Sequence, residues 1–168
     1  MEQTSERDIW LEKAMAQWEV PLLRTCCLLL NDAALAEDAV QETFIKAWRS
    51  YAAFREEASE KTWLMRIAVN TCRDLTRSKW FRHIDRKICL EDLPEPSAPF
   101  DMPDDTVTRA ILSLKRPLRQ VVVLYYYQGL TAQETAEVLR LSKRAVHYRL
   151  DKAKHALECS LEEWYHGQ

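Results

Sequence analysis

The chain has 168 residues, of which 47% are hydrophobic and 30% are charged, and its formal net charge is −2 at pH 7. This length and composition are typical of a folded protein with one compact domain or two small ones, and they exclude a disordered chain. A slightly acidic chain has no overall field that attracts nucleic acid, so any basic binding surface must be local.

Residues that favour helices dominate the chain, and residues that favour turns are few. Only two glycines occur, Gly129 and Gly167, whereas tracts of Ala, Leu, Glu, Lys and Arg recur throughout. Such tracts have a high helix propensity, and loops that depend on glycine have little to work with. The composition therefore predicts an all-α fold.

No segment predicts export or insertion into a membrane. The apolar run at residues 26–30 is much shorter than a membrane-spanning helix. Residues 1–8 are polar and acidic, and they lack the basic and apolar parts of a secretory signal. We therefore expect a cytoplasmic protein.

The reactive residue types do not form a recognisable chemical site. The five cysteines are an odd number and are scattered, which argues against a disulfide framework. His155 and Cys159 lie one helical turn apart, but two ligands do not make a structural zinc site and no second pair completes it. No nucleophile–base pair or phosphate loop is visible. We expect no metal, no cofactor and no enzymatic activity.

Residues 8–81 have a nearly continuous helical pattern. At its first interruption, Asn31 suits a left-handed helix end and Asp32 can cap the next helix. That helix has an inward stripe at 4-3-4 spacing, made by Val40, Phe44, Ala47 and Tyr51. Its opposite side mixes acidic, amide and apolar side chains, namely Asp38, Gln41, Glu42 and Ile45. Taken from the residues alone, this side is ordinary solvated helix surface.

A charged loop is predicted at residues 55–62, followed by a helix with one apolar and one basic side at residues 63–82. The basic side consists of Arg66, Arg73, Arg77 and Lys79.

The composition changes after this helix, because residues 89–105 contain four of the six prolines and six carboxylates. Such a segment buries little surface and resists helix formation, so it predicts a flexible acidic linker. We expect two small helical domains, residues 8–88 and 106–165, joined by a linker at residues 89–105.

Two helices at residues 106–114 and 118–128 are predicted to lead into a helix-turn-helix. Thr131 and Glu134 have the spacing of a capping box, and Ser142 offers an N-cap for a second helix after a short turn. The inward positions are Ala132, Thr135, Ala136 and Leu139, then Val146, Leu150, Ala153 and Leu157. The outer face of the second helix carries Lys143, Arg144, His147, Tyr148, Asp151 and Lys154. Such a face suits a recognition helix in the major groove of DNA, and the alternative is a helical hairpin with a solvated charged face.

Three stretches of the chain resemble the extracytoplasmic-function group of bacterial RNA polymerase sigma factors. They are AEDAVQETFIKAW at residues 36–48, WLMRIAVNTCRD at residues 63–74 and GLTAQETAEVLRLSKRAVHYRLDKAK at residues 129–154. They occur in the family's order, so the resemblance covers nearly the whole chain. It implies a protein that binds core RNA polymerase, directs it to specific promoters and promotes opening of the promoter DNA.

The resemblance also implies roles for individual residues of the first domain. The side formed by Asp38, Gln41, Glu42 and Ile45 would dock on the clamp helices of the polymerase largest subunit. The minus-ten element would be read by Phe54, Trp63, Arg66, Asn70, Arg73 and Arg77. In that set the aromatic and amide groups would hold opened bases and the arginines would contact phosphates. For Trp63 a plain core position is the alternative.

In the second domain, the resemblance implies that the second helix of the helix-turn-helix reads the minus-thirty-five element. Family positions place His147, Tyr148 and Asp151 nearest to the base edges. The cations expected to clamp phosphates are Lys143, Arg144, Arg149 and Lys152. Arg140 occupies a turn position where the family often has glycine, and a left-handed turn would be strained there.

Many members of this family are held inactive by an anti-sigma factor, so we expect such a partner. A self-contained helix-turn-helix repressor or activator is one alternative, which explains the C-terminal domain but not the N-terminal motifs. An enzyme is the second alternative, and the residues offer no site for it.

Overall fold

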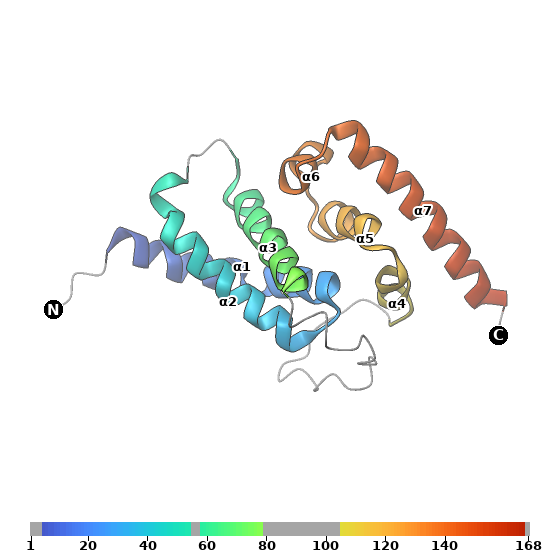
Figure 1. Ribbon diagram of the computed structural model, residues 1–168, viewed down its shortest axis with the longest axis horizontal. Coiled ribbons are helices and arrows are strands. Elements are labelled where there is room, and N and C mark those ends of the chain that lie inside the picture. The colour runs from blue at the N-terminus through green and yellow to red at the C-terminus, as the bar shows by residue number, and fades with distance from the viewer. Residues whose placement is uncertain (1–4, 55–57, 79–104, 167–168) are drawn as a thin grey trace. The chain divides into compact units, whose positions relative to one another are not determined.

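The computed structural model describes residues 5–54, 58–78 and 105–166, with side chains from residue 106 to residue 161 in the last range. All regular structure in these ranges is helical (Figure 1), so the all-α prediction is confirmed. The chain divides into two compact units, Met1–Lys87 and Ile88–Gln168. The predicted linker lies outside the described residues, apart from Asp105 at the start of a helix.

Three helices, α1 (Glu6–Leu30), α2 (Ala33–Ser50) and α3 (Glu60–Arg77), make up the first unit, and each packs against the other two. Their shared core consists of almost fully buried side chains, among them Leu22, Cys26, Leu28, Ala36, Ala39, Ala47, Leu64, Met65, Ala68 and Val69. The alanines on α2 have little bulk at the contact, which allows both neighbouring helices to approach its axis closely.

Local capping explains how α1 and α2 begin and end. Asn31 ends α1 in the left-handed conformation with φ 54°, and Asp32 Oδ1 accepts a hydrogen bond of 2.9 Å from the backbone of Leu35, as predicted. The start of α1 was predicted too late. The helix begins at Glu6, because Ser5 is its N-cap and forms a capping box with Asp8 in the first turn.

The loop before α3 is shorter than predicted. A 3-10 turn, η1 (Tyr51–Ala53), follows α2, and α3 begins at Glu60 rather than at residue 63. The reason is Ser59, whose hydroxyl caps the helix by accepting a hydrogen bond of 3.1 Å from the backbone N–H of Thr62. Residues 79–82, the predicted end of this helix, lie outside the described residues.

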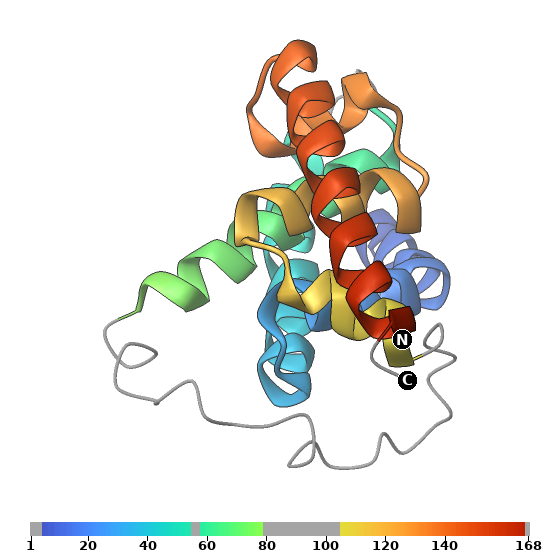
Figure 2. The same cartoon turned by 90° about the vertical axis from the view of Figure 1, so that its right-hand side faces the viewer.

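The second unit comprises α4 (Asp105–Ser113), α5 (Arg116–Val122), a π-helical turn η3 (Val123–Tyr127), α6 (Ala132–Leu139) and α7 (Lys143–His166). The three shorter α-helices all pack against α7, as Figure 2 shows. The prediction of a single helix at residues 118–128 is wrong in detail, because α5 ends at Val122 and a π-helical turn follows it. The backbone N–H of Gln128 donates to Val123 O at 3.0 Å, a π-type bond that changes the winding after α5.

The core of the second unit consists of buried side chains from α5, η3, α6 and α7, among them Val121, Val123, Leu124, Val138, Val146 and Ala153. In the ranges that the structure describes, no helix is both long enough and apolar enough to cross a membrane.

Candidate docking and nucleic-acid surfaces

The mixed side of α2 is on the surface of the first unit. Asp38, Gln41 and Ile45 are exposed, and Glu42 is half-buried. Ile45 is 43% exposed although it is apolar. We call these four residues the docking face. A groove runs along each side of it, one shared with α3 and lined by Thr71, Asp74 and Leu75, the other shared with α1 and lined by Leu11, Met15 and Phe44.

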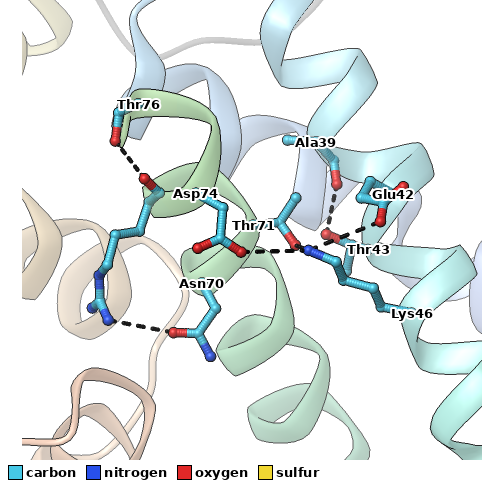
Figure 3. A network of polar contacts seen from close by, with 9 residues as sticks. Ala39, Glu42, Thr43, Lys46, Asn70, Thr71, Asp74 and Thr76 are labelled. Atoms are coloured by element: carbon cyan, nitrogen blue, oxygen red, sulfur yellow. Dashed lines mark hydrogen bonds and ion pairs between the residues drawn. The ribbon is translucent and has the colours of Figure 1, made fainter. Parts of the chain in front are cut away.

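A lysine links the docking face to α3 (Figure 3). The Nζ atom of Lys46 lies 3.9 Å from Glu42 Oε1 and 3.6 Å from Asp74 Oδ2, and it donates a hydrogen bond of 3.2 Å to Thr71 Oγ1. These groups are partly exposed, so each ion pair contributes about 1 kcal/mol or less. The charge of Glu42 is therefore partly engaged within the unit, whereas Asp38 has no ion pair with another described residue.

Phe54 and Trp63 stack on each other across the loop that precedes α3. Their ring centroids lie 4.5 Å apart, and Trp63 also contacts Trp10 of α1, with centroids 5.7 Å apart. Phe54 is half-buried, whereas Trp63 is only 7% exposed. The structure thus brings these two predicted site residues together, but it gives Trp63 the core position that was the alternative.

The four polar residues predicted on α3 lie on one face of the helix, because residues 66, 70, 73 and 77 follow 4-3-4 spacing. Arg66 and Arg77 are exposed, and Asn70 and Arg73 are half-buried. Arg73 Nη1 donates a long hydrogen bond of 3.5 Å to Asn70 Oδ1. We call this set the α3 stripe. Lys79 lies outside the described residues.

The helix-turn-helix has the predicted caps. Thr131 Oγ1 accepts a hydrogen bond of 3.1 Å from the backbone of Glu134, whose Oε2 accepts one of 2.8 Å from the backbone N–H of Thr131. Ser142 Oγ accepts a hydrogen bond of 3.1 Å from the backbone of Ala145 at the start of α7. Between these caps, Arg140 is left-handed, with φ 55° and ψ 47°. The strained turn inferred from the sequence is therefore present.

The N-terminal half of α7 exposes a basic and aromatic face. The exposed members are Lys143, Arg144, His147, Tyr148, Asp151, Lys152 and Lys154, and Arg149 is half-buried. Tyr148 is 62% exposed, and Lys152 Nζ lies 5.6 Å from the centre of its ring. Asp151 is the one carboxylate in residues 143–157, so the local field on this helix is strongly positive.

Both regions of the chain match models of the same protein class. Residues 16–82 match the model for sigma-70 region 2, and residues 104–157 match the model for sigma-70 region 4. The chain is 30% identical over 162 residues to the ECF RNA polymerase sigma factor SigL of Mycobacterium tuberculosis, covering 94% of this chain and 89% of SigL. The chain belongs to the extracytoplasmic-function (ECF) sigma factors. It is therefore a promoter-specific transcription initiation factor that acts with RNA polymerase.

Two further similarities support the same assignment. This sigma factor is 30% identical over 147 residues to the RNA polymerase sigma-H factor of Pseudomonas aeruginosa, covering 79% of this chain and 76% of the relative. Its structure is similar to that of CnrH, solved in complex with the cytosolic domain of CnrY, with a TM-score of 0.68 and 26% identity. The match covers 90% of this chain and 87% of CnrH.

Three cysteines of the first unit, Cys26, Cys27 and Cys72, are buried or half-buried, whereas Cys159 is exposed. Cys26 and Cys72 are buried, and the hydrogen bond between the two thiols, together with burial, raises the pKa of Cys26. Burial raises the pKa of Cys27 to about 11. Thiols with raised pKa values are poor nucleophiles and poor metal ligands at neutral pH. Among the described residues, no group of three or more His, Cys, Asp or Glu side chains is arranged to hold a metal ion.

One group of residues beside the minus-ten candidates of this sigma factor was not predicted from the sequence. The carboxylate of Glu60 accepts hydrogen bonds from the indoles of Trp10 and Trp18, although both tryptophans lie more than forty residues earlier in the chain. The two tryptophans of α1 were the only hint in the sequence that indole donors occur there. Their neighbours in the sequence do not indicate which acceptor the indoles reach.

Proposed function

We propose that the docking face of α2 binds the clamp helices of the polymerase largest subunit. Its exposed apolar residue, Ile45, lies next to acidic and amide groups, and such a mixed face is expected of a contact between proteins. The grooves on both sides offer space for side chains of an elongated helical partner. The partial pairing of Glu42 with Lys46 supports Asp38 as the carboxylate more available to a partner.

The loop before α3 and the α3 stripe are proposed to recognise the opened minus-ten element. Opened bases must be held unstacked, which aromatic planes and amide groups favour. Phe54 offers the partly accessible ring, and Trp63 packs beneath it as its support. Asn70 supplies an amide, and the arginines at positions 66, 73 and 77 supply charge for phosphates. The observation that supports this role most strongly is that these polar groups share one face of α3.

The exposed face of α7 is proposed to read the minus-thirty-five element from the major groove. His147 can donate or accept a hydrogen bond, and Asp151 can accept from a cytosine amine, so both can discriminate between bases. Tyr148 lies beside them. The cations proposed to hold phosphates are Lys143, Arg144, Arg149 and Lys152, and they add affinity without sequence information.

We also propose how the protein is organised and where it acts. The first domain spans residues 8–88 and the second residues 106–165, with a linker at residues 89–105. The protein works in the cytoplasm and catalyses no reaction of its own. An anti-sigma factor restrains it, a role supported by the complex of the similar protein CnrH with the cytosolic domain of CnrY.

Transcription from two templates tests the minus-ten role. Relative to the unchanged protein, holoenzymes with Phe54→Ala or Asn70→Ala should lose initiation on closed duplex. This loss should be at least several-fold larger than their loss on a template melted in advance at the minus-ten element. Gln17→Ala changes an exposed residue of α1 outside every proposed surface and serves as the control. Equal losses on the two templates would show that the variants affect folding or docking, and the proposed role would be wrong.

A further inference from the structure

Two tryptophans of α1 converge on one carboxylate at the start of α3. The Nε1–H of Trp10 donates a hydrogen bond of 2.7 Å to Glu60 Oε2, and the Nε1–H of Trp18 donates one of 2.6 Å to Glu60 Oε1. Each indole thus uses a different oxygen, which fixes the orientation of the carboxylate. Short hydrogen bonds to an ionised acceptor are among the stronger polar contacts in proteins.

The same helix also contacts the chain on both sides of the loop before α3. The Trp10 ring lies 4.9 Å from the ring of Tyr51, which precedes the loop, and 5.7 Å from that of Trp63, which follows it. Trp63 in turn stacks on Phe54 at 4.5 Å. Glu60 is the first residue of α3, next to its N-cap Ser59. Its two hydrogen bonds therefore fix the end of the loop opposite Phe54.

A second indole–carboxylate contact in this unit involves neither Glu60 nor the aromatic residues that flank the loop before α3. The Nε1–H of Trp48 donates a hydrogen bond of 2.8 Å to Asp8 Oδ1, which joins the start of α1 to α2. The two contacts share donor and acceptor chemistry and long separation along the chain. If both contacts only stabilised the fold, removing either one should have the same effect on promoter opening. If Glu60 also positions the loop before α3, only the loss of its contact should impair opening.

We propose that Glu60, held by Trp10 and Trp18, is a positioning residue for promoter opening. It sets the distance between the start of α3 and Phe54, and so the geometry in which opened bases are held. Through this carboxylate, α1 influences how efficiently the holoenzyme captures the opened strand. The inference rests on the minus-ten role proposed above for Phe54 and the α3 stripe.

The most selective variant is Trp18→Phe, which removes one donor to Glu60 and keeps an aromatic side chain. Among the described ring pairs, Trp63 contacts Trp10 rather than Trp18, so the aromatic contacts of Trp63 and Phe54 are retained. Trp48→Phe is the matched control, because it removes the same kind of donor from Asp8. The readout is the ratio of initiation on closed duplex to initiation on the pre-melted template, which cancels losses in polymerase binding or in folded protein.

Trp18→Phe is expected to lower this ratio about tenfold, the size expected for losing one hydrogen bond to a charged group. Glu60→Gln, which removes the charge and one of the two acceptor oxygens, should lower it as well, and the double variant should lose less than the product of the single effects, because both changes act on the same contact. Trp48→Phe should leave the ratio near that of the unchanged protein. A ratio that Trp18→Phe does not alter, or that both tryptophan variants alter equally, would overturn the inference.

Phe54→Ala, measured in the same assay, separates this inference from the proposed function. If Phe54→Ala lowers the ratio and Trp18→Phe does not, the positioning role of Glu60 alone is wrong. If Phe54→Ala leaves the ratio unchanged, the proposed minus-ten role is wrong, and the inference that rests on it fails too.

Discussion

The ammonium group of Lys46 lies 3.6 Å from the carboxylate of Asp74, so an ion pair joins the helix that carries the docking face to the helix that carries the α3 stripe (Figure 3). Lys46 also lies 3.9 Å from Glu42. Reversing the charge of Glu42 would disturb this network as well as any partner contact. Asp38 is therefore the better residue for testing the docking face.

Asp38→Lys should weaken the binding of this sigma factor to core polymerase by about tenfold, because a cation would replace an acidic contact at a charge-complementary interface. Affinity can be measured by titrating labelled sigma factor with core enzyme. Glu37→Lys makes the same change of net charge at an exposed neighbouring position outside the docking face, and it should have little effect. Equal losses for both variants would point to a general charge effect and against a specific docking face.

Asp151→Ala should relax the preference at one base position of the minus-thirty-five element, at a cost of about 1–3 kcal/mol in discrimination. Lys152→Ala should weaken binding to all DNA sequences alike. It should also reduce, by about one unit, the slope of the logarithm of the binding constant against the logarithm of the salt concentration. Promoter selection and salt titration with each holoenzyme measure the two effects. Lys13→Ala, at an exposed position of α1, is the control. If Lys152→Ala changes base preference and Asp151→Ala does not, the two roles are reversed.

Arg140→Gly should raise the free energy of unfolding of the second unit by about 0.5–1 kcal/mol. The left-handed conformation costs an L-residue roughly 1–2 kcal/mol, and the greater backbone entropy of glycine in the unfolded chain offsets part of the gain. Hydrogen exchange of the backbone amides of α6 and α7 measures the stability of the second unit separately from that of the first. Asn31→Gly, at the left-handed end of α1, should give a smaller gain in α1, because asparagine tolerates this conformation. No slowing of exchange in Arg140→Gly would contradict the strain at this turn.

Trp48→Phe should raise the pKa of Asp8 toward its ordinary value of 3.8. In the folded protein the hydrogen bonds from Trp48 and Ser5 lower this pKa. Because the pKa of Asp8 is lower in the folded protein than in the unfolded chain, ionised Asp8 stabilises the fold. This contribution to stability is fully present at pH values above 3.8 and is lost as the pH falls through the folded-state pKa. Nuclear magnetic resonance titration of the Asp8 carboxyl measures the shift. Trp18→Phe should leave it unchanged, and an unchanged pKa in Trp48→Phe would refute the assigned cause.

The helix ends and the inward faces could be predicted because the groups that decide them are close in the sequence. Thr131 and Glu134 are three residues apart, and Asp32 and Leu35 are also three apart, so each capping bond is a local event. The exposed face of α7 followed in the same way from helical periodicity. The π-helical turn after α5 was missed, since residues 121–127 are all apolar or aromatic and have no periodicity that distinguishes the two windings.

The sequence by itself therefore determined the fold class, the family and the faces that each helix presents. Only the tertiary structure decided which distant groups meet. It gave Trp63 a buried place against Phe54 and Trp10, joined Lys46 to Asp74, and brought Trp10 and Trp18 to Glu60. These partners are separated by nine to fifty-three residues, and helical periodicity specifies which face a residue occupies but not which side chain on another helix it touches. That choice is made when the three helices pack, because the packed core fixes their register against one another.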